Sequence, residues 1–190
     1  LQTSHAILYG FGTIYWIENG ISKSVIALFW VEGVIAVIVL FWFGTKLNVR
    51  YGPVGLMIFA AVAGVIRWTI TGLTLNIWLL ASAQILHAFT FGAAYLGAME
   101  FLKQAAPDEL AASAQALFNA IAMGLAFAVA LPVAGYAFAE FTGASYLLMS
   151  ALSLFGGIGA LLLGKIWSGK RLIIPVKMSN SPKIIKYGVL

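Results

Sequence analysis

Residues 68–99 read WTITGLTLNIWLLASAQILHAFTFGAAYLGAM and contain no charged side chain. A transmembrane helix needs about 20 consecutive, mostly apolar residues, so this stretch is long enough to hold one span and the end of another. Residues 110–139 and 141–164 are also free of charge and rich in Leu, Ala, Phe and Ile. Uncharged stretches of this length and number predict an all-α membrane protein.

The composition agrees with this prediction. Of 190 residues, 62% are hydrophobic and 9% are charged, with a net charge of +5, whereas a soluble domain has about 45–50% apolar and about 25% charged residues. This excludes a soluble enzyme, a disordered chain and a collagen-like chain, and a nucleic-acid partner is not expected despite the basic balance. The natural partner of such a chain is the lipid bilayer.

Motifs for enzyme chemistry are missing from the sequence. The chain has no cysteine and two histidines, so disulfides, thiol catalysis and a zinc site are excluded. No phosphate-binding P-loop, no paired metal-binding acids and neither Gly-x-Ser-x-Gly nor His-Glu-x-x-His occurs. We therefore expect no enzyme activity, no cofactor and no metal.

Six helices are predicted within a bundle over residues 1–167, followed by a basic tail over residues 168–190. Breakers and polar residues separate the helices, which are expected at about residues 5–17, 25–43, 54–73, 77–101, 112–137 and 146–167. Pro132 is expected to kink the fifth of them, because proline removes a backbone hydrogen bond.

Lysine and arginine residues set the expected orientation. Nine of them fall on one side of the predicted bundle: Lys46, Arg50, Lys103 and six within residues 165–186. Only Lys23 lies in a connection on the other side. Since Lys and Arg are retained in the cytoplasm, the C-terminus is predicted to be cytoplasmic. Leu1 is not a methionine and no signal peptide is recognisable, so we expect the chain to be the C-terminal part of a longer protein.

Three ionisable residues, Arg67, His87 and Glu32, fall at membrane depth on three different predicted helices. An Arg at the centre of a transmembrane helix costs about 2.5–3.5 kcal/mol on insertion scales, so such residues face a bundle interior or a wet cavity. One shared cavity would explain all three, and a proton could then move on or off His87 or Glu32. The alternatives are snorkelling of Arg67 to the outer surface, a packed neutral histidine, and a structural ion pair between Glu32 and Arg67.

Polar and aromatic stripes extend this candidate cavity. Gln84, His87 and Thr90 recur at helical spacing, and Asn119 follows Gln115 by one turn on the fifth helix. His5, Tyr9, Gly12 and Trp16 form one stripe on the first helix. These stripes predict that His5, Tyr9, Trp16, Gln84, Thr90 and Asn119 face the substrate. Ordinary packing is the alternative explanation for the aromatic stripe.

Several short motifs point to a known family when they are taken together. They are Ser4-His5-Ala6, Phe11-Gly12-Thr13-Ile14-Tyr15-Trp16, Gly33-Val34-Ile35-Ala36, Ile66-Arg67-Trp68, Gln84-Ile85-Leu86-His87 with Thr90-Phe91, and Ala122-Met123-Gly124. In their order and spacing they resemble the C-terminal half of transporters of the major facilitator superfamily. The branch most similar to them contains 3-phenylpropionic acid transporters and oligosaccharide–proton symporters.

This resemblance implies a fold and a function. The six helices would be helices 7–12 of a twelve-helix transporter in a bacterial inner membrane, with an N-terminal six-helix half missing. The implied function is proton-coupled transport of a small organic acid, including aromatic acids. The spacing of Arg67 and His87 resembles that of an Arg and a His in the family's coupling network. Glu32 joins them in the predicted network if it has taken over the role of the family's acidic residue; otherwise coupling rests on the missing half or is lost. Arg50 and Gly52 match the family's cytoplasmic loop motif, although Val49 stands where an aspartate is common.

The sequence also departs from the family's coupling residues. Thr90 and Val37 occupy positions where acidic residues are expected in the family, and neither can carry a proton. Two other interpretations therefore stay open at this point. The chain could be a complete six-helix protein with a structural or assembly role, or an inactive remnant of a transporter.

Overall fold

The computed structural model describes residues 1–171, and the regular structure in this part of the chain is helical throughout. This confirms the predicted all-α class. Most of the predicted basic tail, from residue 172 onward, lies outside the described residues. The elements in chain order are η1 (Gln2–His5), α1 (Ala6–Glu18), α2 (Lys23–Trp42), α3 (Gly44–Leu73), α4 (Ile77–Ile85), η2 (Ala88–Ala93), α5 (Ala94–Ala105), η3 (Asp108–Leu110), α6 (Ala111–Phe118), η4 (Asn119–Leu125), α7 (Ala126–Phe141), η5 (Thr142–Ser145) and α8 (Tyr146–Ile166).

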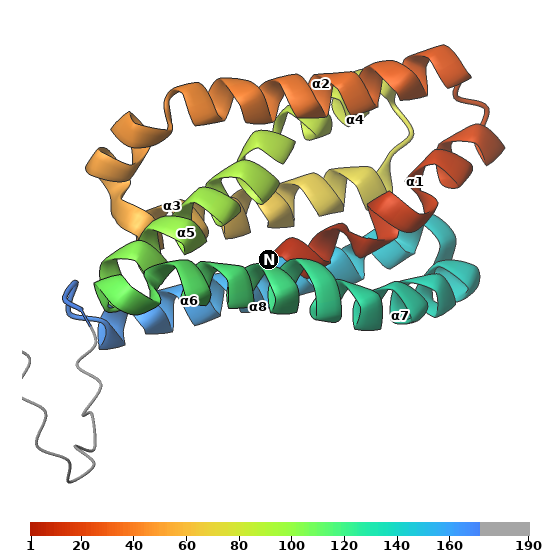
Figure 1. Cartoon of the computed structure of the whole chain (residues 1–190). Helices are drawn as coiled ribbons and strands as arrows, with labels where there is room; N and C mark the ends of the chain where they lie inside the picture. Colours follow the sequence, from red (N-terminus) through yellow and green to blue (C-terminus); the bar gives the residue numbers. More distant parts are fainter. Residues whose placement is uncertain (172–190) are drawn as a thin grey trace, which may run out of the picture.

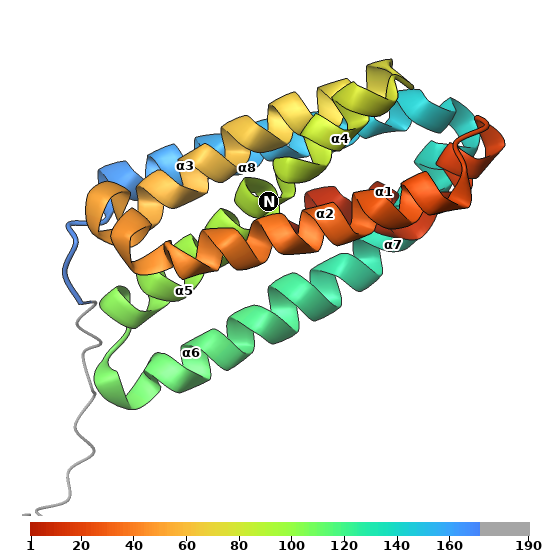
Figure 2. The same cartoon turned by 90° about the horizontal axis from the view of Figure 1, so that it is seen from above.

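Four helical stretches are long and apolar enough to cross a membrane, namely Lys23–Trp42, Gly44–Leu73, Ile77–Ala105 and Asp108–Ile166. The last one has 59 residues, and the chain reverses within it at Thr142, whose φ is 45°. Figure 2 shows α6 and α7 in the outward leg and α8 in the return leg, with α6 and α8 on opposite sides of the bundle. Because α1 has 13 residues, the count of six membrane-spanning helices stays a prediction.

Side-chain caps fix the starts of two helices, α2 and α4. The Ser22 hydroxyl accepts a hydrogen bond from the backbone N–H of Val25 at 3.4 Å and begins α2. The Asn76 side-chain oxygen accepts from the N–H groups of Trp78 and Leu79 and begins α4. Both residue types are preferred N-caps, because their oxygens satisfy N–H groups that have no partner within the helix.

The segment before the third predicted helix differs from its prediction. A connection was expected over residues 45–53, but the helix α3 already begins at Gly44, and the chain bends within it at Gly52, with φ 67° and ψ 171°. Glycine adopts a positive φ without a steric penalty, and Pro53 then suits the first turn of the next helical segment. The polar residues of this segment resembled a loop in the sequence, whereas they form a short amphipathic helix.

Small residues let the helices approach each other closely. A side-chain carbon on Gly97 in α5 would lie 2.7 Å from the backbone oxygen of Pro53 in α3, and one on Gly157 in α8 would lie 2.8 Å from the Ala61 side chain. Small-residue interfaces of this kind are typical of helices packed within membranes. Helix α3 packs against both α5 and α8, and we call these three helices the α3 layer.

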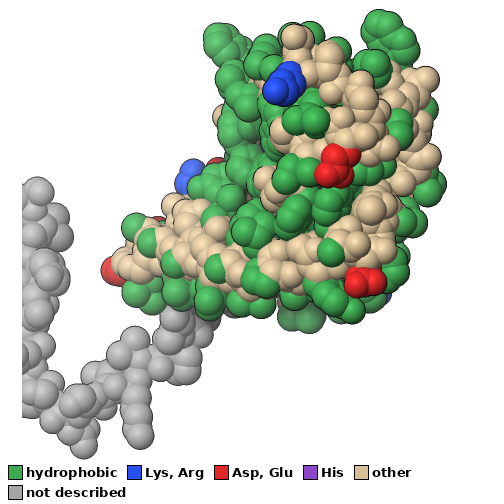
Figure 3. Space-filling model, turned by 90° about the vertical axis from the view of Figure 1, so that its right-hand side faces the viewer, with side chains coloured by type: hydrophobic (Ala, Val, Ile, Leu, Met, Phe, Trp, Pro, Cys, Tyr) green, Lys and Arg blue, Asp and Glu red, His purple; other side chains and the backbone are tan. Residues whose placement is uncertain are grey.

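Large buried side chains join α1 to this layer. Trp16 on α1, Trp68 on α3 and Tyr146 on α8 are each at most 1% exposed. Many large apolar side chains remain on the outside, including Leu28, Phe155 and Ile166. The space-filling view shows a surface that is largely apolar with few charged side chains (Figure 3), as expected for a surface that contacts lipid.

Two helices contain a wider turn. The segments η2 and η4 are π-helical, and they join α4 to α5 and α6 to α7. Pro132, where a kink was expected, lies inside α7, and the irregular turn lies before it, in η4. Such turns are rare and are often found at functional sites. One of them, η2, carries Thr90.

Candidate functional site

Arg67 is the centre of the candidate site. It lies on α3, is 1% exposed, and donates three hydrogen bonds to residues on and around α4 and η2. Its Nη1 donates to His87 Nδ1 and to Thr90 Oγ1, each at 2.9 Å. Its Nη2 donates to Gln84 Oε1 at 2.9 Å. The structure thus brings together Arg67, His87, Gln84 and Thr90, which the sequence placed in one cavity.

The bond from Arg67 fixes the protonation of His87. A guanidinium only donates hydrogen bonds, so Nδ1 of His87 is the acceptor and has no proton. The imidazole then carries its proton on Nε2, which lies 3.4 Å from the Tyr9 hydroxyl. His87 is therefore neutral while this contact with Arg67 is present.

His5 holds the opposite tautomer. Its Nδ1 lies 3.0 Å from the backbone oxygen of Gln2, which only accepts, so Nδ1 is the donor. Its Nε2 lies 3.1 Å from Thr90 Oγ1 and accepts the hydroxyl proton. The same hydroxyl oxygen accepts from Arg67. Hydrogen bonds therefore run in one direction from Arg67 through Thr90 and His5 to Gln2, and we call these four residues the Arg67 chain.

The charge of Arg67 has no acidic partner in residues 1–171. The ion pairs formed there are Lys103 with Glu100 and Arg171 with Asp108, and none involves Arg67. The Trp68 ring, 4.5 Å from the guanidinium carbon, offers a cation–π contact. The Nε of Arg67 also has no hydrogen-bond partner within residues 1–171. Buried charges are normally paired, so an anion would complete this site.

A small pocket of about 150 Å³ opens beside Arg67. Its walls come from α1, α2, α3 and α4, and its lining residues are Tyr9, Phe29, Trp30, Gly33, Val34, Arg67, Gln84 and His87. Small-molecule pockets usually enclose about 300–1,000 Å³. This pocket is therefore smaller than a complete site for a small molecule. Its lining combines a cation with aromatic rings.

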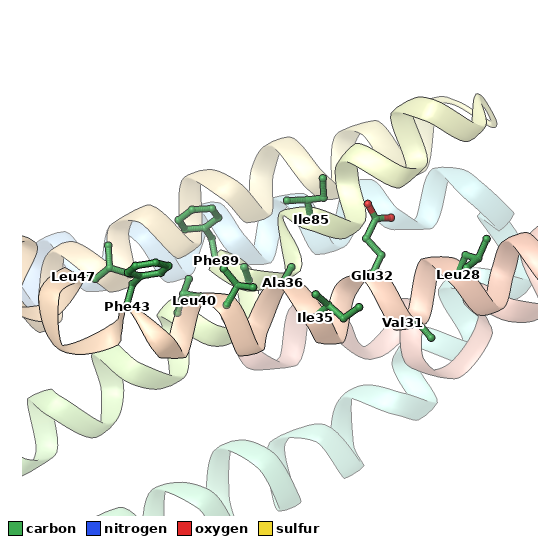
Figure 4. Close-up of a pocket in the computed structure, with 12 residues that line it drawn as sticks. Leu28, Val31, Glu32, Ile35, Ala36, Leu40, Phe43, Leu47, Ile85 and Phe89 are labelled. Atoms are coloured by element: carbon green, nitrogen blue, oxygen red, sulfur yellow. The ribbon is translucent and has the colours of Figure 1, made fainter.

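Glu32 does not join this site, contrary to the prediction of one cavity for all three ionisable residues. Its neighbour Gly33 packs on His87, and a side-chain carbon on Gly33 would lie 3.4 Å from His87 Cδ2. Adjacent residues on a helix point about 100° apart. Glu32 therefore faces a different groove, where its carboxylate points across to α4 beside Ile85 (Figure 4).

The other predicted cavity residues fall into two groups. Tyr9 and Gln84 line the pocket, while His5 and Thr90 lie behind it at 0% and 2% exposure. Trp16 was expected to face the substrate, but it is 1% exposed and packs edge-on against Phe29, with ring centroids 5.2 Å apart.

The two remaining groups of predicted residues lie away from the pocket. Asn119 is half-buried in η4 and is not a lining residue of the pocket. Arg50 of the loop motif is exposed and lies over the Tyr51 ring at 5.4 Å, and Gly52 forms the bend in α3. Val49, at the position of the expected aspartate, is 82% exposed.

Sequence reasoning missed two residues of the site. Trp30 lines the pocket, and its indole N–H donates to the Thr13 hydroxyl at 3.1 Å. Ser4 accepts a hydrogen bond at 3.2 Å from the indole N–H of Trp68, the residue beside Arg67. Trp30 precedes Gly33 by three positions and so shares its helix face, which was a usable signal.

Comparison with known proteins now identifies the family. The MFS_1 like family matches residues 1–150. The chain belongs to the MFS_1 like family. It is 36% identical over 136 residues to the probable 3-phenylpropionic acid transporter of Escherichia coli (strain K12), covering 72% of this chain and 36% of that protein. It is 28% identical over 117 residues to the maltose permease of Geobacillus stearothermophilus, covering 61% of this chain and 30% of that protein.

Family membership settles the general class of the protein. The chain spans about a third of the length of these curated relatives. No solved structure matches it. The predicted resemblance to major facilitator transporters is confirmed, and the chain is an integral membrane protein of a transporter family and not an enzyme. The lipid bilayer is therefore a partner of this chain.

Proposed function

We propose that this chain supplies one wall of the cavity through which a secondary transporter moves a small carboxylic acid. The observation that carries the proposal is the buried Arg67, whose hydrogen-bond partners in residues 1–171 are all neutral. A carboxylate would bring the missing negative charge, and guanidinium groups bind carboxylates in a planar, two-bond geometry. Tyr9 and Trp30 in the same pocket suit an aromatic body on that acid.

The family supports this choice of substrate and the rest of the architecture. One relative is named a probable 3-phenylpropionic acid transporter, which is an acid with an aromatic ring. In this proposal the six helices pair with a six-helix half that precedes them, the cavity opens alternately to the two sides, and the C-terminus faces the cytoplasm of a bacterium. A structural six-helix protein or a transporter remnant would have no need for an anion at Arg67.

Coupling to a proton follows from the His87 tautomer. His87 Nδ1 accepts a hydrogen bond from Arg67, so a proton on Nδ1 and the contact with Arg67 exclude each other. Protonation of His87 would release Arg67 Nη1 toward the substrate carboxylate. Proton binding and acid binding would then favour the same state. Glu32 takes no part in this step.

Binding measurements test the proposal, because the residues that it assigns to the acid, Arg67, Tyr9 and Trp30, all lie in this chain. Purified chain in lipid nanodiscs would be titrated with 3-phenylpropionate and with its uncharged amide. We expect the acid to bind at least about tenfold more tightly, since hydrogen bonds to a charged group contribute about 1.5–3 kcal/mol. Arg67→Gln should abolish the preference, whereas the exposed control Lys165→Gln should keep it. Equal binding of acid and amide would reject the proposal.

Proton coupling has its own measurement. Calorimetric titration of 3-phenylpropionate in buffers of different ionisation enthalpy reports the number of protons taken up on binding. We expect uptake of a proton by the wild-type chain and none by His87→Gln, which keeps a hydrogen-bond acceptor for Arg67. Identical proton uptake in both proteins would remove His87 from the coupling step but would leave the anion site intact.

A further inference from the structure

A second and larger cavity lies on the other face of α2. It is a groove of about 790 Å³ between α2, the start of α3, α4 and η2. Of its twelve lining residues, eleven are apolar and one is Glu32. A volume of about 300–1,000 Å³ with mostly apolar walls and few polar groups is typical of ligand sites. We call this cavity the Glu32 groove.

The carboxylate of Glu32 has no partner in the part of the chain that the structure describes. No ion pair or hydrogen bond of residues 1–171 reaches it. Glu32 stands near the middle of α2 (Lys23–Trp42), so it lies about 14 Å along the helix from its start. An acidic side chain at this depth is costly unless it is paired, and Arg67 and His87 lie on the other face of α2.

The groove is asymmetric along its length. Figure 4 shows Glu32 toward one end, with its carboxylate directed into the space between α2 and α4. The rings of Phe43 and Phe89 lie toward the other end, beside Leu47. A matching occupant has one polar end and an extended apolar or aromatic body.

The charge and depth of Glu32 select the occupant. A phospholipid acyl chain would fill the apolar part but would leave the carboxylate unpaired, and the cationic group of a phospholipid stays near the membrane surface. A hydrophobic amine carries its positive charge into the bilayer and donates to a carboxylate through a charge-assisted hydrogen bond. We propose that the Glu32 groove is a binding site for a lipophilic monocation, with its ammonium group on Glu32 and its apolar body against Phe43 and Phe89.

This site is independent of the proposed acid site. The two cavities lie on different faces of α2, and they carry opposite charges, Arg67 in one and Glu32 in the other. A failure of acid binding at Arg67 would therefore leave the Glu32 groove unaffected, and the reverse also holds.

The test uses a matched pair of probes, 4-phenylbutylamine and the uncharged 4-phenylbutanol. Both would be titrated by calorimetry into the chain in phosphatidylcholine nanodiscs, with empty nanodiscs subtracted. We expect the amine to bind at least about tenfold more tightly than the alcohol. Glu32→Gln should make the two affinities equal, the exposed control Glu140→Gln should leave the preference intact, and Ala36→Phe should weaken both probes by filling the groove.

Three outcomes would overturn the proposal. Equal affinity of amine and alcohol for the wild-type chain would show that lipid or any apolar body fills the groove. An equal effect of Glu32→Gln and Glu140→Gln would show that the charge preference is not local. Disulfide cross-linking of two chains through Val39→Cys, which lines the groove, would show that a second copy occupies it. Gel filtration of each variant would verify that it remains folded.

Discussion

At the scale of single residues, Thr90 determines how Arg67 is held. Its hydroxyl accepts from Arg67 Nη1 at 2.9 Å and lies 3.1 Å from His5 Nε2. The family resemblance led us to expect an acidic residue at this position. The consequence of a threonine here is that Arg67 keeps its full charge for another anion, instead of sharing it with a carboxylate in the same chain.

Thr90→Val should separate the two ends of the Arg67 chain. Valine has nearly the same shape but no hydroxyl, so one N–H of Arg67 and the acceptor nitrogen of His5 lose their partner. We expect a loss of stability of about 1–3 kcal/mol, measured by thermal unfolding followed by circular dichroism in detergent. Thr90→Ser keeps the hydroxyl and serves as the control. Equal unfolding temperatures for the two variants would show that this hydroxyl does not hold the network.

Sequence reasoning was successful for some of these residues and failed for others. The pairing of Arg67 with Gln84, His87 and Thr90 was predictable, because a polar stripe on an apolar helix must face a polar neighbour. The direction of the Glu32 side chain was not predictable. Glu32 and Gly33 are adjacent in sequence, and only the packing of α2 decides which of the two lies against His87. Trp16 was misplaced for the same reason, since a helix stripe does not state which neighbouring helix covers it.

At the scale of helices, close backbone contacts set the geometry of the layer that carries Arg67. Helix α5 approaches α3 closely at Gly97, where an added side-chain carbon would lie 2.7 Å from the backbone oxygen of Pro53. Backbone atoms cannot move aside as side chains do. The position of α3, and with it that of Arg67, therefore depends on the absence of a side chain at this glycine.

Gly97→Leu should force α5 away from α3. We expect overpacking to cost about 1–3 kcal/mol, seen as a lower unfolding temperature and a lower yield of folded chain from the membrane. Gly159→Leu is the matched control, because open space surrounds Gly159 and no atom lies within 4 Å of the position of its added carbon. If both variants unfold at the same temperature, the contact of α5 with α3 is not limiting.

The helices themselves were partly predictable. The long apolar stretches marked the cores of α2, α3 and the later helices, because apolar length alone indicates a membrane helix. The helix over residues 44–51 was missed, because its polar side chains are also typical of a loop. The π-helical turns η2 and η4 could not be recognised from the spacing of apolar residues. A single wider turn changes which face of the helix is apolar only for the residues that follow the turn.

At the scale of the whole molecule, the distribution of positive charge predicts the orientation in the membrane. Lys23 begins α2, directly after the connection from α1, whereas Lys103 and Lys165 lie near the ends of α5 and α8. Figure 1 shows the end of α8 and the connection after α5 at the same end of the bundle. The charge rule assigns that end to the cytoplasm.

Cysteine labelling tests this orientation without a background signal, because the chain has no cysteine of its own. Ser24→Cys is expected to react with a membrane-impermeant maleimide in intact bacterial cells. Lys103→Cys, in the last turn of α5, should react only after the cells are permeabilised. The reverse pattern would place the C-terminus outside the cell, and equal labelling of both variants in intact cells would indicate a mixed orientation.

The hydrogen bonds of the Arg67 chain all run in one direction, so this row of groups is not a route for protons. Arg67 does not release a proton, and at the other end the Gln2 carbonyl only accepts, so no proton enters or leaves this row of groups at either terminus. These hydrogen bonds hold the guanidinium of Arg67 in place, and they do not conduct protons. In the proposed function, a proton taken up with the acid binds His87 instead, which lines the pocket beside Tyr9.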